Sequence, residues 1–504
     1  MQALIDAVLP SMEAAMANVG IQGDYWKKML SRSKEESQGD LALPCFPFAK
    51  QLGISPDETA QKIVNALELD IGQAAAVGPY VNIRASMAWL AAQLSEEPES
   101  KGSILIEHTS ANPNGPFHVG RARNAVLGDT FVRMHRASGY DVTAEYYVDD
   151  MGKQVGILCW ALENLEENQV HNILAEGEIP IEESPHSNKE DHARVLWYQA
   201  ANLLKAKDST VDSGVTELVQ KSEEADADIL ARFEASYQPI LDGMLVTLAR
   251  MGITFDSFTK ESRFIVDGSV EILMDQLQTS ELHGVAENGA HFLELESKGV
   301  KGKSTQFYYR RGDGSSLYAT RDLAYHQHKW TRSGSLLNIL GEDHKLQSKQ
   351  VGIALDELNI KAPEVVFYAF TKLADGKMST RRGNVVFMDD LLDEAQARAL
   401  ETVKEIRSDL PEGKLLEISE AVGVSATRFN IARISPEKGI TFRWSDALSL
   451  EADSAPFIMY SHARACSIQR KAGDVDISEG LNTAELSGSA ADLVRRMAYM
   501  NDVL

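Results

Sequence analysis

The chain has 504 residues, of which 44% are hydrophobic and 25% are charged, and its formal net charge is −24. These values are typical of a soluble globular protein of about three domains, and no apolar run approaches the roughly 18 residues of a membrane-spanning helix. The negative charge argues against a nucleic-acid-binding protein, but local basic stretches stay compatible with one, because exposed charges are screened beyond about 8–10 Å.

Residues 1–98 are predicted to form a small α+β domain. It begins with an amphipathic helix in MQALIDAVLPSMEAAMANVG, which lacks the basic start and the cleavage site of a signal peptide. After QGDLALPCFPFAK come a helical stretch, SPDETAQKIVNALEL, and a strand-like stretch, AAVGPYVNIRAS. The polar run SEEPESKGS is typical of a linker to the next domain.

Residues 99–395 are predicted to form a Rossmann-like α/β domain. The apolar SILIEH predicts a buried strand, ARNAVLGDTFVRMHRASG an amphipathic helix, and YDVTAEYYVDD (140–150) the next strand. This strand–helix–strand order favours parallel pairing of the two strands. The polar turn HTSANPNGPFHVGRARN (108–124) then lies at the carboxyl end of a strand, where open α/β sheets bind ligands.

The rest of the chain is predicted to be mainly helical, with four strand-like runs. Residues 160–235 have the pattern of a helical insertion with a polar excursion, EGEIPIEESPHSNKED. The strand-like runs are GAHFLELES, STQFYYRR, SLLNILGED and PEVVFYAF. From about residue 390 the pattern is almost wholly helical, and we divide it into a connecting region, 396–450, and a helical domain, 451–504.

Cysteine spacing and local charge bear on the compartment and the partners. Cys45, Cys159 and Cys466 are scattered and odd in number, which favours a reduced cytoplasmic protein without structural zinc. Basic residues gather at 298–311, 380–382 and 462–471, and each stretch is either a nucleic-acid contact or an ordinary solvated surface.

The turn at 108–124 contains the first candidate site. A helix amino terminus offers unpaired N–H groups and the positive end of the helix dipole, which suit a phosphate. Gly120 has no Cβ and lets a base or phosphate approach closely, His118 supplies a neutral or cationic donor, and Arg121 supplies a permanent cation. For H-x-G alone, a polar turn with a capping histidine is the alternative.

The loop DGKMSTRRGN (375–384) is the second candidate site. Its cationic and hydroxyl side chains are those of Lys377, Ser379, Thr380, Arg381 and Arg382. Such a loop could close over a leaving pyrophosphate and stabilise the charge that grows in the transition state. A basic surface loop without a ligand is the alternative.

Two short segments and several long ones carry a family resemblance. HVGR (118–121) and KMSTR (377–381) resemble the HIGH and KMSKS signatures of class I aminoacyl-tRNA synthetases. Five longer segments resemble those of arginyl-tRNA synthetases in particular and occur in the same order as in that family. They are SANPNGPFHVGRARNAVLGD, EYYVDDMGKQVG, LDGMLVTLARMGITFD, SLYATRDLAYH and FRWSDALSLEADSAPFIMYSHARACSI. QGDLALPCFPFAK is similar to the family's appended tRNA-binding domain, so the resemblance spans nearly the whole chain.

The resemblance implies a Rossmann-like catalytic domain with a helical insertion, a tRNA-binding domain at 1–98 and an all-α anticodon-binding domain at 451–504. It implies a ligase that activates L-arginine with ATP, with Mg²⁺ accompanying the nucleotide, and transfers the arginyl group to the 3′ end of tRNA(Arg). Most members of the family need bound tRNA for the first step. We expect a cytoplasmic monomer with no membrane partner and no protein-bound metal.

The resemblance also implies site residues. The expected catalytic residues are His118, Gly120, Arg121, Lys377, Ser379 and Arg381. The expected ATP-binding residues are Asn112, Pro116, His118, Gly120, Arg121 and Met378. The expected arginine-binding residues are Ser110, Asn112, Tyr318, Asp322, Asp343 and His344, and which residue of 342–344 makes the contact stays open. Glu107 and Asp149 are weaker candidates for the same cavity.

The residues themselves give a separate reason to expect arginine. In SSLYATRDLAYH, Tyr318, Asp322 and Tyr325 lie at i, i+4 and i+7 and share one face of a helix. A carboxylate flanked by aromatic rings needs a partner, and a planar guanidinium satisfies both of its oxygens at once, which an ammonium does not. The alternative is an exposed acid paired with Arg321 or Lys329.

The chain departs from the family's signatures at two positions. Arg121 stands where HIGH has its second histidine, and Thr380 where KMSKS has its second lysine, although both loops keep cations. Relatives continue beyond LVRRMAYMNDVL, so we expect the anticodon-binding domain to be incomplete. Three other functions are considered: another class I synthetase, against which Asp322 argues, a nucleotidylyltransferase with a similar turn, and a non-catalytic tRNA-binding relative.

Overall fold

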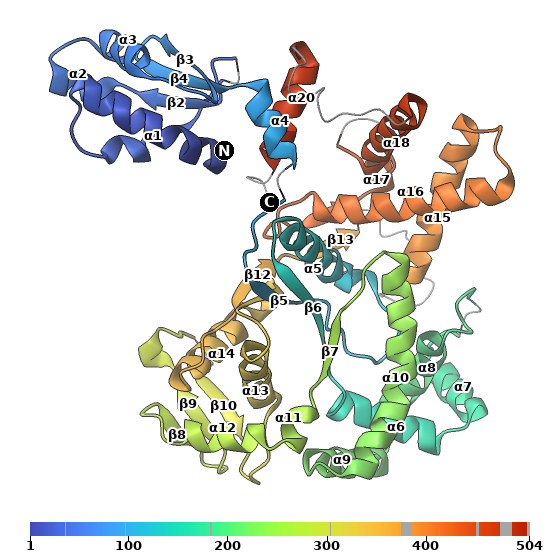
Figure 1. Ribbon diagram of the computed structural model, residues 1–504. Helices are drawn as coiled ribbons and strands as arrows, with labels where there is room; N and C mark the ends of the chain where they lie inside the picture. Colours follow the sequence, from blue (N-terminus) through green and yellow to red (C-terminus); the bar gives the residue numbers. More distant parts are fainter. Residues whose placement is uncertain are drawn as a thin grey trace. The chain divides into compact units, whose positions relative to one another are not determined.

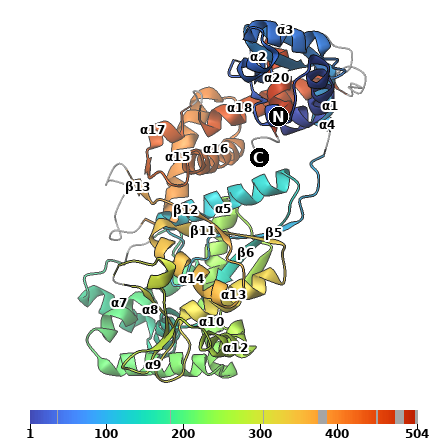
Figure 2. The same ribbon diagram turned by 90° about the vertical axis from the view of Figure 1, so that its left-hand side faces the viewer.

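The computed structural model describes residues 1–35, 37–95, 97–181, 184–302, 304–373, 386–449, 453–473 and 486–500. The chain splits into two compact units, and Figures 1 and 2 draw their elements from two sides. The first unit consists of Met1–Ser100, Ala137–Gly139 and Ile468–Leu504, and the second of Lys101–Arg136 and Tyr140–Ser467. Within the described residues, no helix combines the length and the apolar character needed to cross a lipid bilayer.

The first unit is built on a four-stranded antiparallel sheet in the order β1–β2–β4–β3. Its elements are α1 (Gln2–Val19), a 3₁₀ turn (Tyr25–Lys28), β1 (Ser31–Arg32), β2 (Leu41–Pro44), α2 (Phe46–Leu52), α3 (Pro56–Ala66), β3 (Gly72–Val77), β4 (Tyr80–Ala85), α4 (Met87–Ser95) and α20 (Gly488–Ala498). Ser55 and Glu58 form a capping box, with Pro56 at the first helical position, so the sequence SPDE fixes the start of α3. The helices and the sheet enclose one apolar core, in agreement with the predicted α+β composition.

The second unit is built on a five-stranded parallel sheet in the order β12–β11–β5–β6–β7. Its strands are β5 (Ser103–Glu107), β6 (Asp141–Val148), β7 (Ser257–Lys260), β11 (Ser335–Gly341) and β12 (Glu364–Tyr368). The chain builds the sheet outward from β5 to β7 and then adds β11 and β12 on the other side of β5. The strand order therefore reverses between β5 and β11, and doubly wound sheets bind ligands beyond the carboxyl ends of the strands at such a reversal. The Rossmann-like prediction is confirmed.

Helices connect the neighbouring parallel strands. α5 (Val119–Ala137) joins β5 to β6, and α14 (Lys345–Glu357) joins β11 to β12. Between β6 and β7 lies the helical insertion, formed by α6 (Lys153–Asn164), α7 (Glu167–Glu176), α8 (Glu190–Lys205), α9 (Ser209–Glu223) and α10 (Ala227–Arg250), drawn in green in Figure 1. The insertion extends beyond the predicted 160–235, because α10 continues as one 24-residue helix past Pro239 and buries its apolar face in the main core.

The segment between β7 and β11 forms a further group of helices and strands. It comprises α11 (Arg263–Val266), α12 (Ser269–Leu277), β8 (His283–Val285), β9 (His291–Glu294), a 3₁₀ turn (Glu296–Lys298), β10 (Gln306–Arg310) and α13 (Tyr318–Trp330). The predicted strands GAHFLELES and STQFYYRR pair antiparallel with each other in a separate three-stranded sheet, β10–β9–β8. SLLNILGED and PEVVFYAF instead form β11 and β12 of the parallel sheet.

The later part of the chain contains α15 (Met388–Ile406), α16 (Glu412–Ala432), α17 (Trp444–Ala447) and α18 (Ala455–Ala472). The prediction of an almost wholly helical region is wrong for residues 440–442, because β14 (Ile440–Phe442) pairs in parallel with β13 (Thr371–Leu373). The partner strand is distant in the sequence, so the local pattern around β14 does not reveal the pairing.

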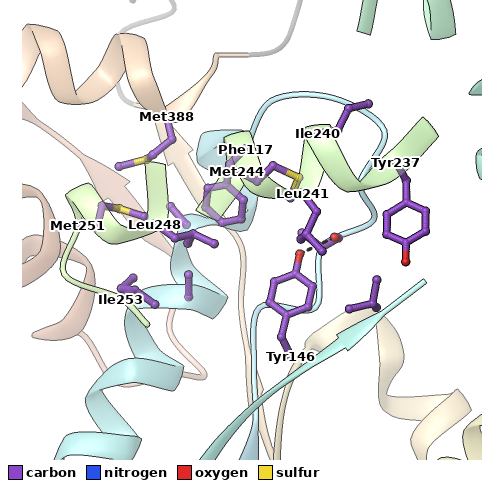
Figure 3. Packing of buried hydrophobic residues seen from close by; sticks show 14 of the residues in the cluster. Phe117, Tyr146, Tyr237, Ile240, Leu241, Met244, Leu248, Met251, Ile253 and Met388 are labelled. Atoms are coloured by element: carbon purple, nitrogen blue, oxygen red, sulfur yellow. Dashed lines mark hydrogen bonds between the residues drawn. The ribbon is translucent and has the colours of Figure 1, made fainter. Parts of the chain in front are cut away.

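Apolar packing fixes the turn that precedes α5. Figure 3 shows Met244 of α10 close to Phe117, the residue before His118, and Met388, the first residue of α15, belongs to the same buried cluster. On the sheet side, the Tyr146 hydroxyl donates a hydrogen bond of 2.6 Å to the Ala111 carbonyl, drawn as a dashed line in Figure 3. The candidate ligand-binding turn is therefore held between the sheet and α10.

Close packing of α5 on the sheet gives a test of this arrangement. A Cβ at Gly128 would lie 2.2 Å from Cβ and Cγ of His108, directly after β5. Gly128→Ala is therefore expected to destabilise the protein by about 1–3 kcal/mol, the usual cost of overpacking a core. The control is Gly413→Ala in α16, where the added Cβ meets no atom within 4 Å and stability should stay unchanged or rise by up to about 1 kcal/mol. Thermal unfolding compares the two variants, and equal unfolding midpoints would contradict the packing.

Candidate active site

A cavity of about 1250 Å³ opens at the carboxyl ends of β5 and β11, where the strand order reverses. Its walls come from the turn after β5, the ends of β6 and β11, α9 of the insertion, α13 and the segment after β11. Residues that the sequence predicted for this site line it, namely Ser110, Asn112, His118, Gly120, Arg121, Tyr318, Asp322, Asp343 and His344, together with the weaker candidates Glu107 and Asp149. The parallel sheet thus gathers these separate segments at one place, as the sequence pattern predicts.

The turn after β5 has an unusual backbone. Thr109 and Ser110 have positive φ angles of 68° and 38°, a left-handed conformation that is uncommon for side chains of this kind and clusters at functional sites. The Thr109 N–H donates to Asn124 Oδ1 at 2.8 Å, and Asn124 in turn donates to the Ile339 carbonyl at 2.9 Å. The turn is thereby tied to α5 and to β11, on both sides of the strand reversal.

The same turn orients the side chains of Ser110 and Asn112. Ser110 Oγ accepts a hydrogen bond of 3.0 Å from the Tyr147 N–H of β6. Asn112 Nδ2 donates to Gln154 Oε1, also at 3.0 Å, near the start of α6. Pro116, predicted to contact ATP, is buried in the turn and is not among the residues that line the cavity, because the turn packs inward beside Phe117.

The HVGR segment forms the first turn of α5. Arg121 Nε donates to His118 Nε2 at 3.2 Å, so the imidazole is neutral and carries its proton on Nδ1. Burial, followed by the charge of Arg121, lowers the pKa of His118 to about 4. Of the two forms considered from the sequence, the neutral donor is the one present. A Cβ at Gly120 would press against the His118 ring at 3.0 Å, which explains the glycine there.

The segment that follows the second signature loop is joined to this turn. Lys377, Met378, Ser379 and Arg381 lie outside the described residues. The described chain resumes at Val386, whose carbonyl accepts from the Val119 N–H at 3.0 Å, and the Met388 N–H donates to the Phe117 carbonyl at 2.8 Å. His118 and Phe387 form the antiparallel β-bridge between these two bonds. The backbone around the first signature is therefore paired with residues 386–388, which follow the second signature in the chain.

Asp322 lies on the wall formed by α13, with its side chain 28% exposed. Burial alone would raise the pKa of Asp322, but His326, followed by Lys329 and His344, more than offsets burial and keeps it below its ordinary value. His326 Nδ1 lies 3.3 Å from Asp322 Oδ1 and 2.7 Å from its carbonyl oxygen. Asp322 is therefore an ionised carboxylate on the cavity wall, and His326 is its closest ionic partner among the described residues.

The two tyrosines expected beside Asp322 have different environments. Tyr318 is 58% exposed and lines the cavity, as predicted. Tyr325 is fully buried and does not line the cavity, which corrects the prediction of a shared face. Its ring stacks on Tyr147 at 4.0 Å, because α13 turns this side toward the sheet. Of the two tyrosines, Tyr318 therefore shares the cavity lining with Asp322 and Tyr325 does not.

The cations proposed as alternative partners of Asp322 have closer partners. Lys329 is fully buried and donates to Glu107 Oε2 at 2.7 Å and to Asn338 Oδ1 at 3.0 Å. Arg321 forms a buried ion pair with Glu261 and lies 3.8 Å from Glu223. The alternative of an exposed acid paired with either cation is therefore wrong, although Lys329 contributes to the low pKa of Asp322.

Glu261 is the main cavity residue that sequence reasoning missed. It lies directly after β7 and lines the cavity together with Asp149, a weaker candidate from the sequence that follows β6. Burial raises the pKa of both carboxyl groups, to about 6 for Asp149, while Arg321 opposes the rise. The available signal was the position of Glu261 after a strand, but β7 is four residues long and Phe258 is its one apolar residue, so the pattern did not reveal it.

The described lining is rich in acid. Its carboxylates are Glu107, Asp149, Glu223, Glu261, Asp313, Asp322 and Asp343. Its permanent cations are Arg121, Lys153, Arg311 and Arg321, of which the last two are paired with glutamates. Such a wall suits a cationic ligand, while the amino end of α5 suits an anion. Of residues 342–344, Asp343 and His344 line the cavity and Glu342 does not.

Comparison with protein families gives two matches. Residues 86–438 match the model of the class I (R) tRNA synthetase catalytic domain, and residues 2–85 match the arginyl-tRNA synthetase N-terminal domain. The arginine–tRNA ligase of Methanocella arvoryzae is 40% identical over 98% of this chain and 86% of its own length. That of Methanothermobacter thermautotrophicus is 37% identical over 97% and 85%.

Solved structures show the same fold. The arginyl-tRNA synthetase of Thermus thermophilus superimposes with a TM-score of 0.74 at 24% identity, covering 99% of this chain and 87% of that one. The enzyme of Plasmodium falciparum gives a TM-score of 0.73 at 14% identity with the same coverage.

The contact between His118 and Arg121 predicts a measurable titration. Because Arg121 is the second cause of the low pKa of His118, Arg121→Gln should raise that pKa from about 4 while leaving it below 6.5, since burial remains. NMR titration of labelled histidine measures the shift. Arg136→Gln, in the last turn of the same helix, should not change it. An unchanged or lower pKa in Arg121→Gln would contradict the assigned contact.

Proposed function

The chain belongs to the arginyl-tRNA synthetase family, and we propose that it performs this family's reaction in the cavity at the ends of β5 and β11. It activates L-arginine with ATP and transfers the arginyl group to tRNA(Arg). The observation that carries the site assignment is Asp322, an ionised carboxylate that faces the cavity while the neighbouring cations are engaged elsewhere.

Asp322 is proposed to receive the guanidinium of the substrate. A guanidinium presents parallel N–H groups that match the two oxygens of a carboxylate, and it stays charged at all ordinary pH values. His326 Nδ1 lies 2.7 Å from the Asp322 carbonyl oxygen and 3.3 Å from Oδ1, and the Asp322 carboxylate keeps acceptor capacity for the substrate. Tyr318, Ser110 and Asn112 line the same cavity, and we assign Ser110 and Asn112 to the amino-acid head group.

The first chemical step takes place at the amino end of α5. A carboxylate oxygen of arginine attacks the α-phosphorus of ATP, the bond to the bridging oxygen breaks, and pyrophosphate leaves with the electron pair. Catalysis here is mainly positioning and stabilisation of phosphate charge. Neutral His118 can donate its Nδ1 proton as a hydrogen bond, and Arg121 supplies a permanent positive charge beside it. Gly120 lets the nucleotide approach the backbone.

Residues of the second signature and Mg²⁺ complete the proposed site. Lys377, Ser379 and Arg381 would stabilise the leaving pyrophosphate, and Met378 and Asn112 would contact ATP. Mg²⁺ usually keeps phosphate oxygens among its ligands, so the ion would enter the site with the nucleotide. When bound, the ion would neutralise phosphate charge.

In the second step the terminal 2′-hydroxyl of the tRNA attacks the carbonyl of arginyl-adenylate and releases AMP. We propose that residues 1–98 and 451–504 contact the tRNA, that residues 396–450 connect the domains, and that the protein acts as a cytoplasmic monomer. The catalytic domain is taken as residues 99–395.

His118→Ala tests the role of the first signature. Loss of one donor to the transition state should lower the rate of tRNA-dependent pyrophosphate exchange by about 10²–10³. The control is His171→Ala, in α7 and away from the cavity lining, which should keep the parent rate. An unchanged rate in His118→Ala would remove this histidine from the mechanism.

Asp322→Asn tests the arginine pocket. The substitution replaces the charged carboxylate by a neutral amide of nearly the same shape. The KM for arginine should therefore rise by about 10- to 100-fold, while the KM for ATP stays the same. The control is Asp356→Asn, an exposed carboxylate of α14 outside the lining. If Asp322→Asn leaves the arginine KM unchanged, or raises the ATP KM equally, the pocket assignment is wrong.

A further inference from the structure

A buried polar cluster joins the helical insertion to the start of α15. Asp389 is 3% exposed and accepts hydrogen bonds from Lys189 at 2.7 Å and Thr247 at 2.9 Å. His192 Nε2 lies 3.0 Å from the same carboxylate. Lys189 immediately precedes α8, Thr247 belongs to α10, and Asp389 is the second residue of α15. Three elements that are distant in the sequence thus converge on one carboxylate.

A side-chain cation lies between the two carboxylates of the cluster. Asp191, His192 and Asp389 are close enough together to hold a metal ion. The Lys189 ammonium, however, contacts both carboxylates, at 2.7 Å from Asp389 and 3.3 Å from Asp191. Gly243 of α10 makes room for Asp191, because a Cβ there would lie 2.5 Å from its carboxylate. The pocket is therefore shaped around an internal ion pair, and burial of one partner alone would be unfavourable.

Asp389 of the cluster lies two residues after Phe387, which directly precedes α15 and forms the β-bridge with His118. The Met388 N–H donates a hydrogen bond to the Phe117 carbonyl. The ring of His192 also packs edge-on against the Phe387 ring, with centroids 5.2 Å apart. Displacement of Asp389 would shift residues 386–388, and these residues are hydrogen-bonded to both sides of His118.

We propose that Asp389 is a positioning residue for His118, held in place by Lys189, His192 and Thr247 of the insertion. The insertion then not only contributes to the cavity wall. Through Asp389 it also fixes the position of the backbone around His118. The inference rests on the proposed role of His118 in adenylation. Positional errors of about 1 Å at a reacting group lower rates on the order of 100-fold, so a remote contact of this kind has a kinetic signature.

A double-mutant cycle tests the proposal. Asp389→Asn should lower kcat for tRNA-dependent pyrophosphate exchange by about 10- to 100-fold and change the KM for arginine less than about threefold. In the His118→Ala background, Asp389→Asn should cause little further loss, because the group that it positions is already absent. The matched control Asp390→Asn, at the next position of α15, should keep the parent kcat.

Three results would overturn the proposal: an equal further loss of rate in the His118→Ala background, a rise in the arginine KM without a fall in kcat, or an unchanged kcat. Thermal unfolding accompanies each variant, and if Asp389→Asn does not fold, Lys189→Met, whose side chain is 20% exposed, takes its place in the cycle. The proposed function is tested separately, by whether the parent protein catalyses tRNA-dependent pyrophosphate exchange with arginine. The double-mutant cycle compares only the ratios of rates between variants.

Discussion

The reversal of strand order between β5 and β11 is the constraint on which the rest of the site depends. Parallel strands bring their carboxyl ends to one edge of the sheet, and at the reversal that edge stays open to a ligand. The turn before His118, the end of β6 and the segment of Asp343 all reach the cavity from such strand ends. The topology therefore assembles the site from segments that share no local sequence relationship.

Charge is divided within this cavity in a way that matches the two substrates. The amino end of α5, with Arg121 beside neutral His118, is suited to phosphate, whereas the described carboxylates dominate the rest of the lining. Internal pairing decides which carboxylate remains for a ligand. Glu261 holds Arg321 and Glu107 holds Lys329, while among the described residues the closest ionic partner of Asp322, on the cavity wall, is the His326 imidazole.

The sequence was most informative where a site depends on local order. The strand, polar turn and helix around His118 follow from periodicity, and the spacing of Tyr318 and Asp322 places both on the cavity wall. Sequence patterns did not reveal contacts between residues that are far apart in the sequence. Neither Glu261 after β7 nor the pairing of β13 with β14 has a local pattern, and Tyr325 faces the sheet because α13 packs that way. The ion pairs of Lys329 and Asp389 join segments about 200 residues apart, which periodicity does not detect.

The central claim is that a cavity carboxylate recognises the charge of the arginine side chain. Calorimetric titration of the full chain in the presence of tRNA with arginine and with citrulline, a neutral analogue of nearly the same shape, tests it most directly. The account predicts that citrulline binds at least about 10- to 100-fold more weakly, the range for losing a hydrogen bond to a charged group. Equal affinities for the two ligands would contradict recognition through Asp322.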